Sequence, residues 1–365
     1  MNRLALAALA LWLPVRAIAA LPPANLPELA TPQVSVSTLQ PLHFPNAFGS
    51  HPKFPLEWWY ITGHLHNSSG QELGFQVTFF RLRPPKVWDN PSAFNPRQIY
   101  FAQAAISDPK IGHLLTAQRI ARGGMGLAGA KENSTDVWID HWSLRQNGSD
   151  YVAKVDGKEI AYDLRFHATQ PPLLEGPHGV SQKGPNPQNA SYYYSIPQLQ
   201  VRGTLRLGDQ NENVRGSAWL DHEWSVAYLP KQAVGWDWMG INLVHGGALM
   251  LFQMRKADGE ALWLEGTWRH ADGKVQYLHR QQIHLQPLRF WHSPKTGNRY
   301  PVAWRVAIPG LQFTLQPLMN NQEFVATQST GNVYWEGAVQ AVTKNHEKIG
   351  SGYLELTGYG GNLRF

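Results

Sequence analysis

Two carboxylates lie two residues apart in an aromatic stretch near the middle of the chain, residues 216–225. In an extended strand, alternate side chains share a face, so Asp221 and Glu223 would lie beside Trp219. His222 and Trp224 would point to the other side. A neighbouring like charge and burial against indole rings both raise the pKa of a carboxyl group, so the pair could supply a proton donor. The alternative is structural, with either acid accepting backbone N–H groups.

A second aromatic stretch, residues 51–65, has the alternation of a strand. Glu57 and Trp59 would share one face, with Trp58 and Tyr60 on the other, and a turn at residues 67–70 would lead into a returning strand at residues 74–81. Similar alternation recurs along both halves of the chain. The exception is residues 112–129, which could hold one short helix.

The composition also favours strands. Aromatic residues make up 12% of the 365 residues and charged residues 16%, with 33 Gly and 26 Pro, which is typical of many short strands joined by tight turns. This predicts an all-β protein with two antiparallel barrels or sandwiches, in which closure removes exposed edges. The net charge of +6 comes from scattered Lys and Arg, so we expect no nucleic-acid partner and regard peripheral contact with an anionic membrane as possible.

The first residues resemble an export signal. Residues 1–20 combine Arg3, a short apolar run and small residues before a cleavage site, and residues 21–48 form a Pro-rich extended segment. The chain has no Cys, which excludes disulfides and a lipid-attachment cysteine. We therefore expect an exported protein, periplasmic or secreted.

Several familiar motifs are incomplete. The G-x-G-x-x-G at residues 124–129 follows no apolar strand of a βαβ unit, and the His-Glu pairs at residues 222–223 and 346–347 lack the second His of a zincin helix. His64 and His66 could meet a metal, but the spacing indicates no third ligand, so they are expected to be surface or hydrogen-bonded residues. The sequence predicts neither a metal nor a cofactor.

Four motifs, at residues 57–65, 219–224, 235–238 and 352–359, together resemble the AttH-like secreted proteins, which are related to the carotenoid 1,2-hydratases. The resemblance extends from about residue 51 to residue 365. It implies two lipocalin-like (calycin-type) antiparallel β-barrel domains packed together, at residues 49–228 and 229–365. In hydratase relatives, an acid in the region like Asp221 is thought to protonate an isolated double bond. Those relatives have a histidine and a tryptophan upstream, where this chain has Tyr192, Tyr193 and Tyr194.

Two hypotheses follow. The first is an exported protein that binds an apolar or isoprenoid-like small molecule in a pocket at or between the barrels, with an ABC transporter as a possible partner. The second is a cofactor-independent hydratase-like lyase in which Asp221 is the general acid, assisted by Glu223 and Tyr193. An Asp221→Asn substitution separates them, since a binder would keep its affinity and an enzyme would lose turnover.

The candidate ligand-binding residues are the aromatic and polar side chains of these motifs, although each indole could equally belong to the core. Glu336 and Glu355, in the second half, are expected to be structural. The candidates are Glu57, Trp59, Tyr60, Tyr192, Tyr194, Trp219, His222, Trp224, Trp236, Asp237 and Trp238.

Overall fold

The computed structural model describes residues 34–37, 40–84, 95, 97–227, 229–361 and 363. The predicted signal and much of the Pro-rich segment lie outside these residues. The described chain is all-β, as predicted, with three short 3-10 turns, η1 (Asn46–Phe48), η2 (Pro177–Gly179) and η3 (Arg280–Gln282). No helix among the described residues is long and apolar enough to cross a membrane.

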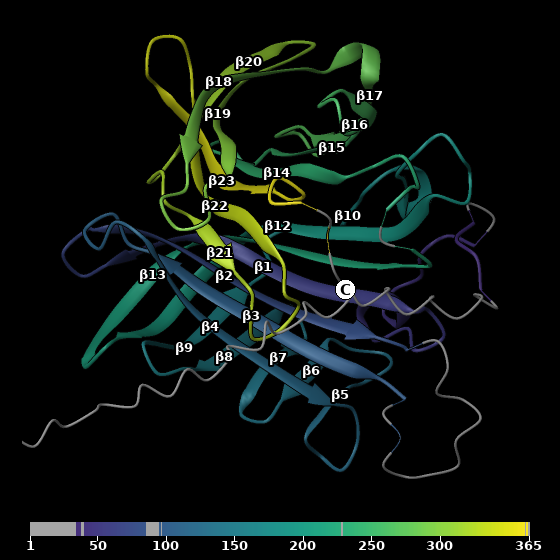
Figure 1. Ribbon diagram of the computed structural model, residues 1–365, viewed down its shortest axis with the longest axis vertical. Coiled ribbons are helices and arrows are strands. Elements are labelled where there is room, and N and C mark those ends of the chain that lie inside the picture. The colour runs from purple at the N-terminus through teal and green to yellow at the C-terminus, as the bar shows by residue number, and fades with distance from the viewer. Residues whose placement is uncertain are drawn as a thin grey trace, which may run out of the picture.

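The first sheet is a nearly closed lipocalin-like barrel of thirteen strands (Figure 1). Eleven of them run in the order β4-β3-β2-β1-β13-β12-β9-β8-β7-β6-β5, and β10 and β11 pair with β12. The strands are β1 (Leu56–Asn67), β2 (Glu72–Leu82), β3 (Ile99–Ser107), β4 (Leu114–Arg122), β5 (Ala128–Ala130), β6 (Asp136–Ile139), β7 (Trp142–Asn147), β8 (Asp150–Asp156), β9 (Ile160–His167), β10 (Leu173–Leu174), β11 (Val180–Gln182), β12 (Ala190–Leu207) and β13 (Gln210–Ser225).

The second sheet forms a half-barrel, seen above the first in Figure 1. Its order is β17-β16-β15-β14-β23-β22-β20-β19-β18, with β21 beside β22. The strands are β14 (Gly235–Leu243), β15 (Ala248–Arg255), β16 (Ala261–Arg269), β17 (Val275–His279), β18 (His284–His292), β19 (Arg299–Ile308), β20 (Leu311–Pro317), β21 (Glu323–Val325), β22 (Val333–Val342) and β23 (Lys348–Leu356). The change of sheet falls between Ser225 and Gly235, an interval that contains the predicted boundary at residues 228/229.

The short helix considered for residues 112–129 is wrong, because this segment forms β4 and β5. The G-x-G-x-x-G motif makes the turn between them, with positive φ angles at Gly124, Met125 and Gly126. Glycine adopts such angles without steric cost. The motif therefore reverses the chain and opens no nucleotide-binding helix.

The two sheets pack against each other through their outer faces. A separate apolar cluster forms there, and it includes Tyr60, Tyr193 and Trp219 from the first sheet and Trp238 and Met250 from the second. Each sheet also encloses its own core. The strands at this contact consequently have two buried faces, one toward their own core and one toward the neighbouring sheet.

A buried histidine also joins the two sheets. His64 on β1 lies with Nδ1 2.8 Å from Glu72 and Nε2 3.0 Å from the carbonyl oxygen of Gly352 on β23. Its side chain is only 3% exposed. This is the hydrogen-bonded role predicted for His64, and it links the barrel to the half-barrel.

Candidate functional site

A cavity lies between the outer faces of the two sheets. Its empty space, with the solvent at its open mouth included, is about 1050 Å³. It opens to solvent on one side, and both sheets contribute aromatic and acidic side chains. The main lining residues are Trp58, Tyr60, Thr78, Phe80, Gln103, Lys183, Tyr193, Asp221, Glu223, Trp236, Trp238, Phe252, Met254, Tyr334, Glu336 and Glu355.

Strand alternation explains which residues reach this cavity. On β13, Asp221 and Glu223 face it, whereas His222 and Trp224 point into the barrel, as the two-residue period predicts. Tyr60 lies directly opposite Asp221 on the paired strand β1. The cavity wall is therefore built from every second residue of its strands.

Asp221 is held by three donors at the cavity wall. The Tyr193 hydroxyl lies 2.8 Å from Oδ2, and Trp219 Nε1 and Ser195 Oγ each lie 2.6 Å from Oδ1. Trp238 Nε1, from the second sheet, donates to the Tyr193 hydroxyl at 3.0 Å. Both sheets thus fix the position of this carboxyl group.

The Ser195 hydroxyl lies between two carboxyl groups. Its Oγ lies 2.6 Å from Asp221 Oδ1 and also 2.8 Å from Oε1 of Glu175, a fully buried residue. A serine hydroxyl has one proton to donate, so only one of these acids can accept it. The other contact requires a protonated carboxyl group as donor. Asp221 and Glu175 therefore hold at least one proton between them.

Burial raises the pKa of both acids. Desolvation raises the pKa of Asp221 to about 7, with the hydrogen bonds from Ser195, Trp219 and Tyr193 opposing the shift. Desolvation likewise raises the pKa of Glu175 to about 8, and the nearby charge of Asp221 adds to it. Both carboxyl groups therefore have pKa values near neutral pH, well above those of exposed acids.

One ammonium group lies at the cavity. Lys183 Nζ is 3.1 Å from Glu223 and lies over the rings of Tyr193 and Phe252, 4.9 and 4.3 Å from their centroids. Its charge balances Glu223. The contacts with the rings are cation–π interactions, so the aromatic wall already holds a positive charge.

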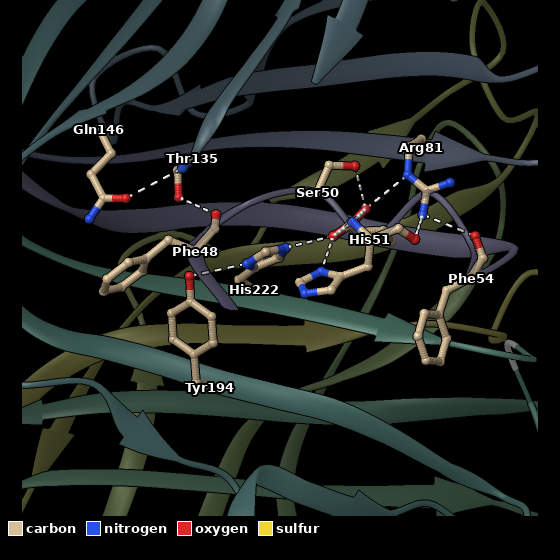
Figure 2. Close-up of polar contacts among 10 residues, drawn as sticks. Phe48, Ser50, His51, Phe54, Arg81, Thr135, Gln146, Tyr194 and His222 are labelled. Atoms are coloured by element: carbon tan, nitrogen blue, oxygen red, sulfur yellow. Dashed lines mark hydrogen bonds and ion pairs between the residues drawn. The ribbon is translucent and has the colours of Figure 1, made fainter. Parts of the chain in front are cut away.

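A second polar cluster lies inside the first barrel, on the other face of the same strands (Figure 2). Buried Glu57 accepts Arg81 Nε at 2.8 Å, His51 Nδ1 at 2.8 Å and His222 Nε2 at 2.9 Å. Burial alone would raise the pKa of Glu57, but Arg81 and these histidines hold it well below its usual range. Burial lowers the pKa of His222 to about 4, so this ring is neutral at physiological pH.

This cluster is an internal salt bridge rather than a metal centre. Candidate ligand atoms of His51, Glu57 and His222 lie within 4.8 Å of one another. However, Glu57 also accepts the Ser50 hydroxyl at 3.0 Å and the His51 backbone N–H, and a divalent ion would meet the Arg81 guanidinium. The His51 ring stacks on Trp224 with centroids 3.6 Å apart. The contacts fasten the segment before β1 to the barrel.

Asp237 is the buried acid of the half-barrel that corresponds to Glu57 in the first barrel. It accepts Arg255 Nε at 2.9 Å, Gln253 Nε2 at 2.6 Å and the Tyr359 hydroxyl at 3.0 Å. Its side chain is fully buried. Like Glu57, it is a buried acid paired with an arginine and is not part of the cavity lining.

The structure therefore divides the predicted site residues into two groups. Asp221, Glu223, Tyr193, Tyr60, Trp236 and Trp238 line the cavity, and Trp219 lies behind its wall, bonded to Asp221. The remaining candidates belong to the opposite faces of the strands, inside the sheets, because each lies one residue from a cavity position. They are Glu57, Trp59, Tyr192, Tyr194, His222, Trp224 and Asp237.

Sequence reasoning missed other residues of the site. Glu175, Ser195 and Lys183 lie outside the recognised motifs, and only their contacts show their place. Glu336 and Glu355, expected to be structural, both line the cavity. A signal for these two was available, because each is the single acid of its strand and has apolar or aromatic neighbours on both sides in the sequence or two residues away.

Comparison with known proteins agrees with the resemblance noted in the sequence. The AttH-like family model matches residues 35–359. A putative AttH from Nitrosomonas europaea is 41% identical and superposes with a TM-score of 0.83 over 89% of this chain and 99% of that one. Kievitone hydratase from Nectria haematococca shares the fold at 14% identity, with a TM-score of 0.67 over 92% of this chain and 98% of that one.

A curated relative is more distant. The dehydratase asqC of Emericella nidulans is 24% identical over 180 residues, which are 47% of this chain and 50% of that protein. The chain thus spans about half the length of this relative. Since the family model covers nearly all of the described residues, the chain belongs to the AttH-like family.

Proposed function

We propose that this protein is an enzyme that adds water to, or removes it from, an uncharged apolar small molecule in the cavity between the sheets. The observation that carries the proposal is the Ser195 hydroxyl, which lies between Asp221 and Glu175 and requires a stored proton at the cavity wall. Asp221 is the general acid, and Tyr193 positions it.

The rest of the cavity suits this chemistry. Protonation of a carbon–carbon double bond, or loss of water from a protonated alcohol, leaves a carbocation. Indole and phenyl faces stabilise positive charge, and Trp58, Trp236, Trp238 and Phe252 supply such faces. The Lys183 ammonium already lies over the rings of Tyr193 and Phe252 in the same wall, so these rings hold one positive charge.

The relatives support the proposal in a limited way. The curated relative is named as a dehydratase, and one protein with the same fold is named as a hydratase. Addition and removal of water are one reaction in two directions, so a single acid can serve both.

The first test is mass spectrometry of an organic extract from protein purified without detergent, beside an identically treated Asp221→Asn variant. We expect compounds that differ by one water between the two preparations. Farnesol, which contains trisubstituted double bonds, serves as a defined probe, and the variant should lose about 10²–10⁴-fold in turnover. The matched control is Asp237→Asn, a buried acid outside the cavity.

The alternative is a carrier. One compound retained in equal amounts by wild type and Asp221→Asn, with no turnover of farnesol, would refute the enzyme and favour an apolar-ligand carrier. Export, an ABC transporter partner and peripheral membrane contact stay separate proposals from the sequence. Fractionation of cells that express the full chain tests the first of them.

A further inference from the structure

A second pair of acids faces the cavity from the half-barrel. Glu336 on β22 and Glu355 on β23 are directly opposite each other in the strand register, and both side chains line the cavity. Directly opposed side chains in an antiparallel pair have Cβ atoms about 4.5–5.5 Å apart. The two carboxyl groups are therefore close neighbours.

The pair differs from the buried acids that stabilise the sheets. Glu57 is bonded to Arg81 and Asp237 to Arg255, whereas no ion pair joins Glu336 or Glu355 to a cation in the described part of the chain. Glu336 is buried and Glu355 is partly buried, and two neighbouring carboxylates without a counter-ion cannot both ionise at low cost. Burial and the charge of Glu355 raise the pKa of Glu336 well above its usual value, and burial raises the pKa of Glu355 to about 7.

Other charged or titratable groups face the cavity from several strands. Tyr60 comes from β1, Tyr334 from β22, Asp221 and Glu223 from β13, and Lys183 from the segment after β11. The charges of Asp221, Glu223 and, from the other face of β14, Asp237 also disfavour a negative charge on Glu355.

Two polar atoms beside the pair are left without partners. Glu336 Oε1 and the Tyr60 hydroxyl are buried and face the cavity, and neither makes a hydrogen bond of normal length within the described residues. Glu336 nevertheless acts on Tyr60 through its charge and through a weak side-chain hydrogen-bond interaction, so the two groups are near each other. A water molecule in the cavity that contacts both would complete their hydrogen bonding.

We infer that Glu336 and Glu355 share one proton and, together with the Tyr60 hydroxyl, bind and activate the water molecule that adds to the substrate. The inference rests on the proposed function, and it assigns the water-binding half of the reaction to the second sheet. Asp221 supplies the proton from the first sheet.

The bonds balance without a further reactant. The Asp221 O–H bond breaks as its proton bonds to one alkene carbon, which leaves a cation on the neighbouring carbon. The water oxygen bonds to that cation, and one water proton passes to the ionised member of the Glu336–Glu355 pair. The alkene and water have become an alcohol, and the extra proton returns from the pair to Asp221 through water in the open cavity. Dehydration is the reverse.

The first experiment counts the shared proton and needs no substrate. Infrared spectra at pH 8 measure the C=O stretch of protonated carboxyl groups in wild type and in the Glu336→Gln/Glu355→Gln double variant. We expect the double variant to lose the intensity of one carboxylic acid, whereas Glu347→Gln, at an exposed position, loses none. Loss of none or of two groups in the double variant would overturn the shared proton.

The second experiment separates the two halves of the reaction. Farnesol is incubated in deuterium oxide or in ¹⁸O-labelled water, so that deuterium reports protonation and ¹⁸O reports water addition. In the double variant we expect ¹⁸O incorporation to fall by at least about 100-fold while deuterium incorporation continues. Equal loss of both labels, or no loss, refutes the water-binding role. An Asp221→Asn variant that retains both labels refutes the proposed function instead.

Discussion

Replacing Tyr193 by Phe should raise the pKa of Asp221. The Tyr193 hydroxyl donates to Asp221 Oδ2 at 2.8 Å and stabilises the ionised carboxylate. A hydrogen bond to a charged group contributes about 1.5–3 kcal/mol. We take the bond between the Tyr193 hydroxyl and the protonated carboxyl group to contribute about half as much. The remaining difference of about 0.75–1.5 kcal/mol corresponds to about half to one pKa unit. From a starting pKa of about 7, we expect a value between about 7.5 and 8.

The assay is the pH titration of the carboxylic acid C=O stretch assigned to Asp221 by its loss in Asp221→Asn. The matched control is Tyr194→Phe, because the neighbouring hydroxyl is bonded to His222 inside the barrel and should leave the titration of Asp221 unchanged. The alkaline limb of any acid-dependent turnover should move upward with the pKa. An unchanged or lower pKa in Tyr193→Phe would refute the assignment of this hydroxyl as a donor to the charged form.

Three further predictions concern charge. Arg81→Met should lower the free energy of unfolding by about 3–5 kcal/mol, because it leaves the buried Glu57 carboxylate without a counter-ion. Unfolding in guanidinium chloride measures this loss. A Glu57→Gln/Arg81→Met variant that regains none of the lost stability would contradict the prediction. His64 lowers the pKa of Glu72 from 4.5 to about 2, so the stability from this pair is complete above the unfolded pKa and falls as the pH drops from about 4.5 to 2. Thermal unfolding should show that loss in wild type but not in Glu72→Gln. Lys183→Met should strengthen binding of dodecyltrimethylammonium by roughly tenfold at low salt, because the cavity loses its cation; equal affinities by tryptophan fluorescence would argue against this.

The sequence was sufficient for the fold class and for the faces of β13, because alternation of side chains is a local property. It could not separate Asp221 from Glu57, since both are acids flanked by indoles. The difference lies in their partners. Arg81 neutralises Glu57 across a strand pair, whereas the donors to Asp221 are the neutral side chains of Tyr193, Ser195 and Trp219.

The parts of the site that the sequence did not predict depend on long-range pairing. Ser195 becomes informative only when Glu175 and Asp221 lie on both sides of it. Glu336 and Glu355 are nineteen residues apart and become a pair through the register of β22 and β23. The short helix considered for residues 112–129 was wrong because its glycines make a turn between strands.

The alternation of cavity and core residues along one strand separates specificity from stability. On β13, a change at Glu223 alters the cavity, whereas a change at Trp224 alters the packing of the barrel. Mutations that reshape the cavity can therefore accumulate without loosening either core. A family built on this arrangement can change the lining of its cavity through substitutions at every second position, and the pattern of divergence among its members should follow that two-residue period.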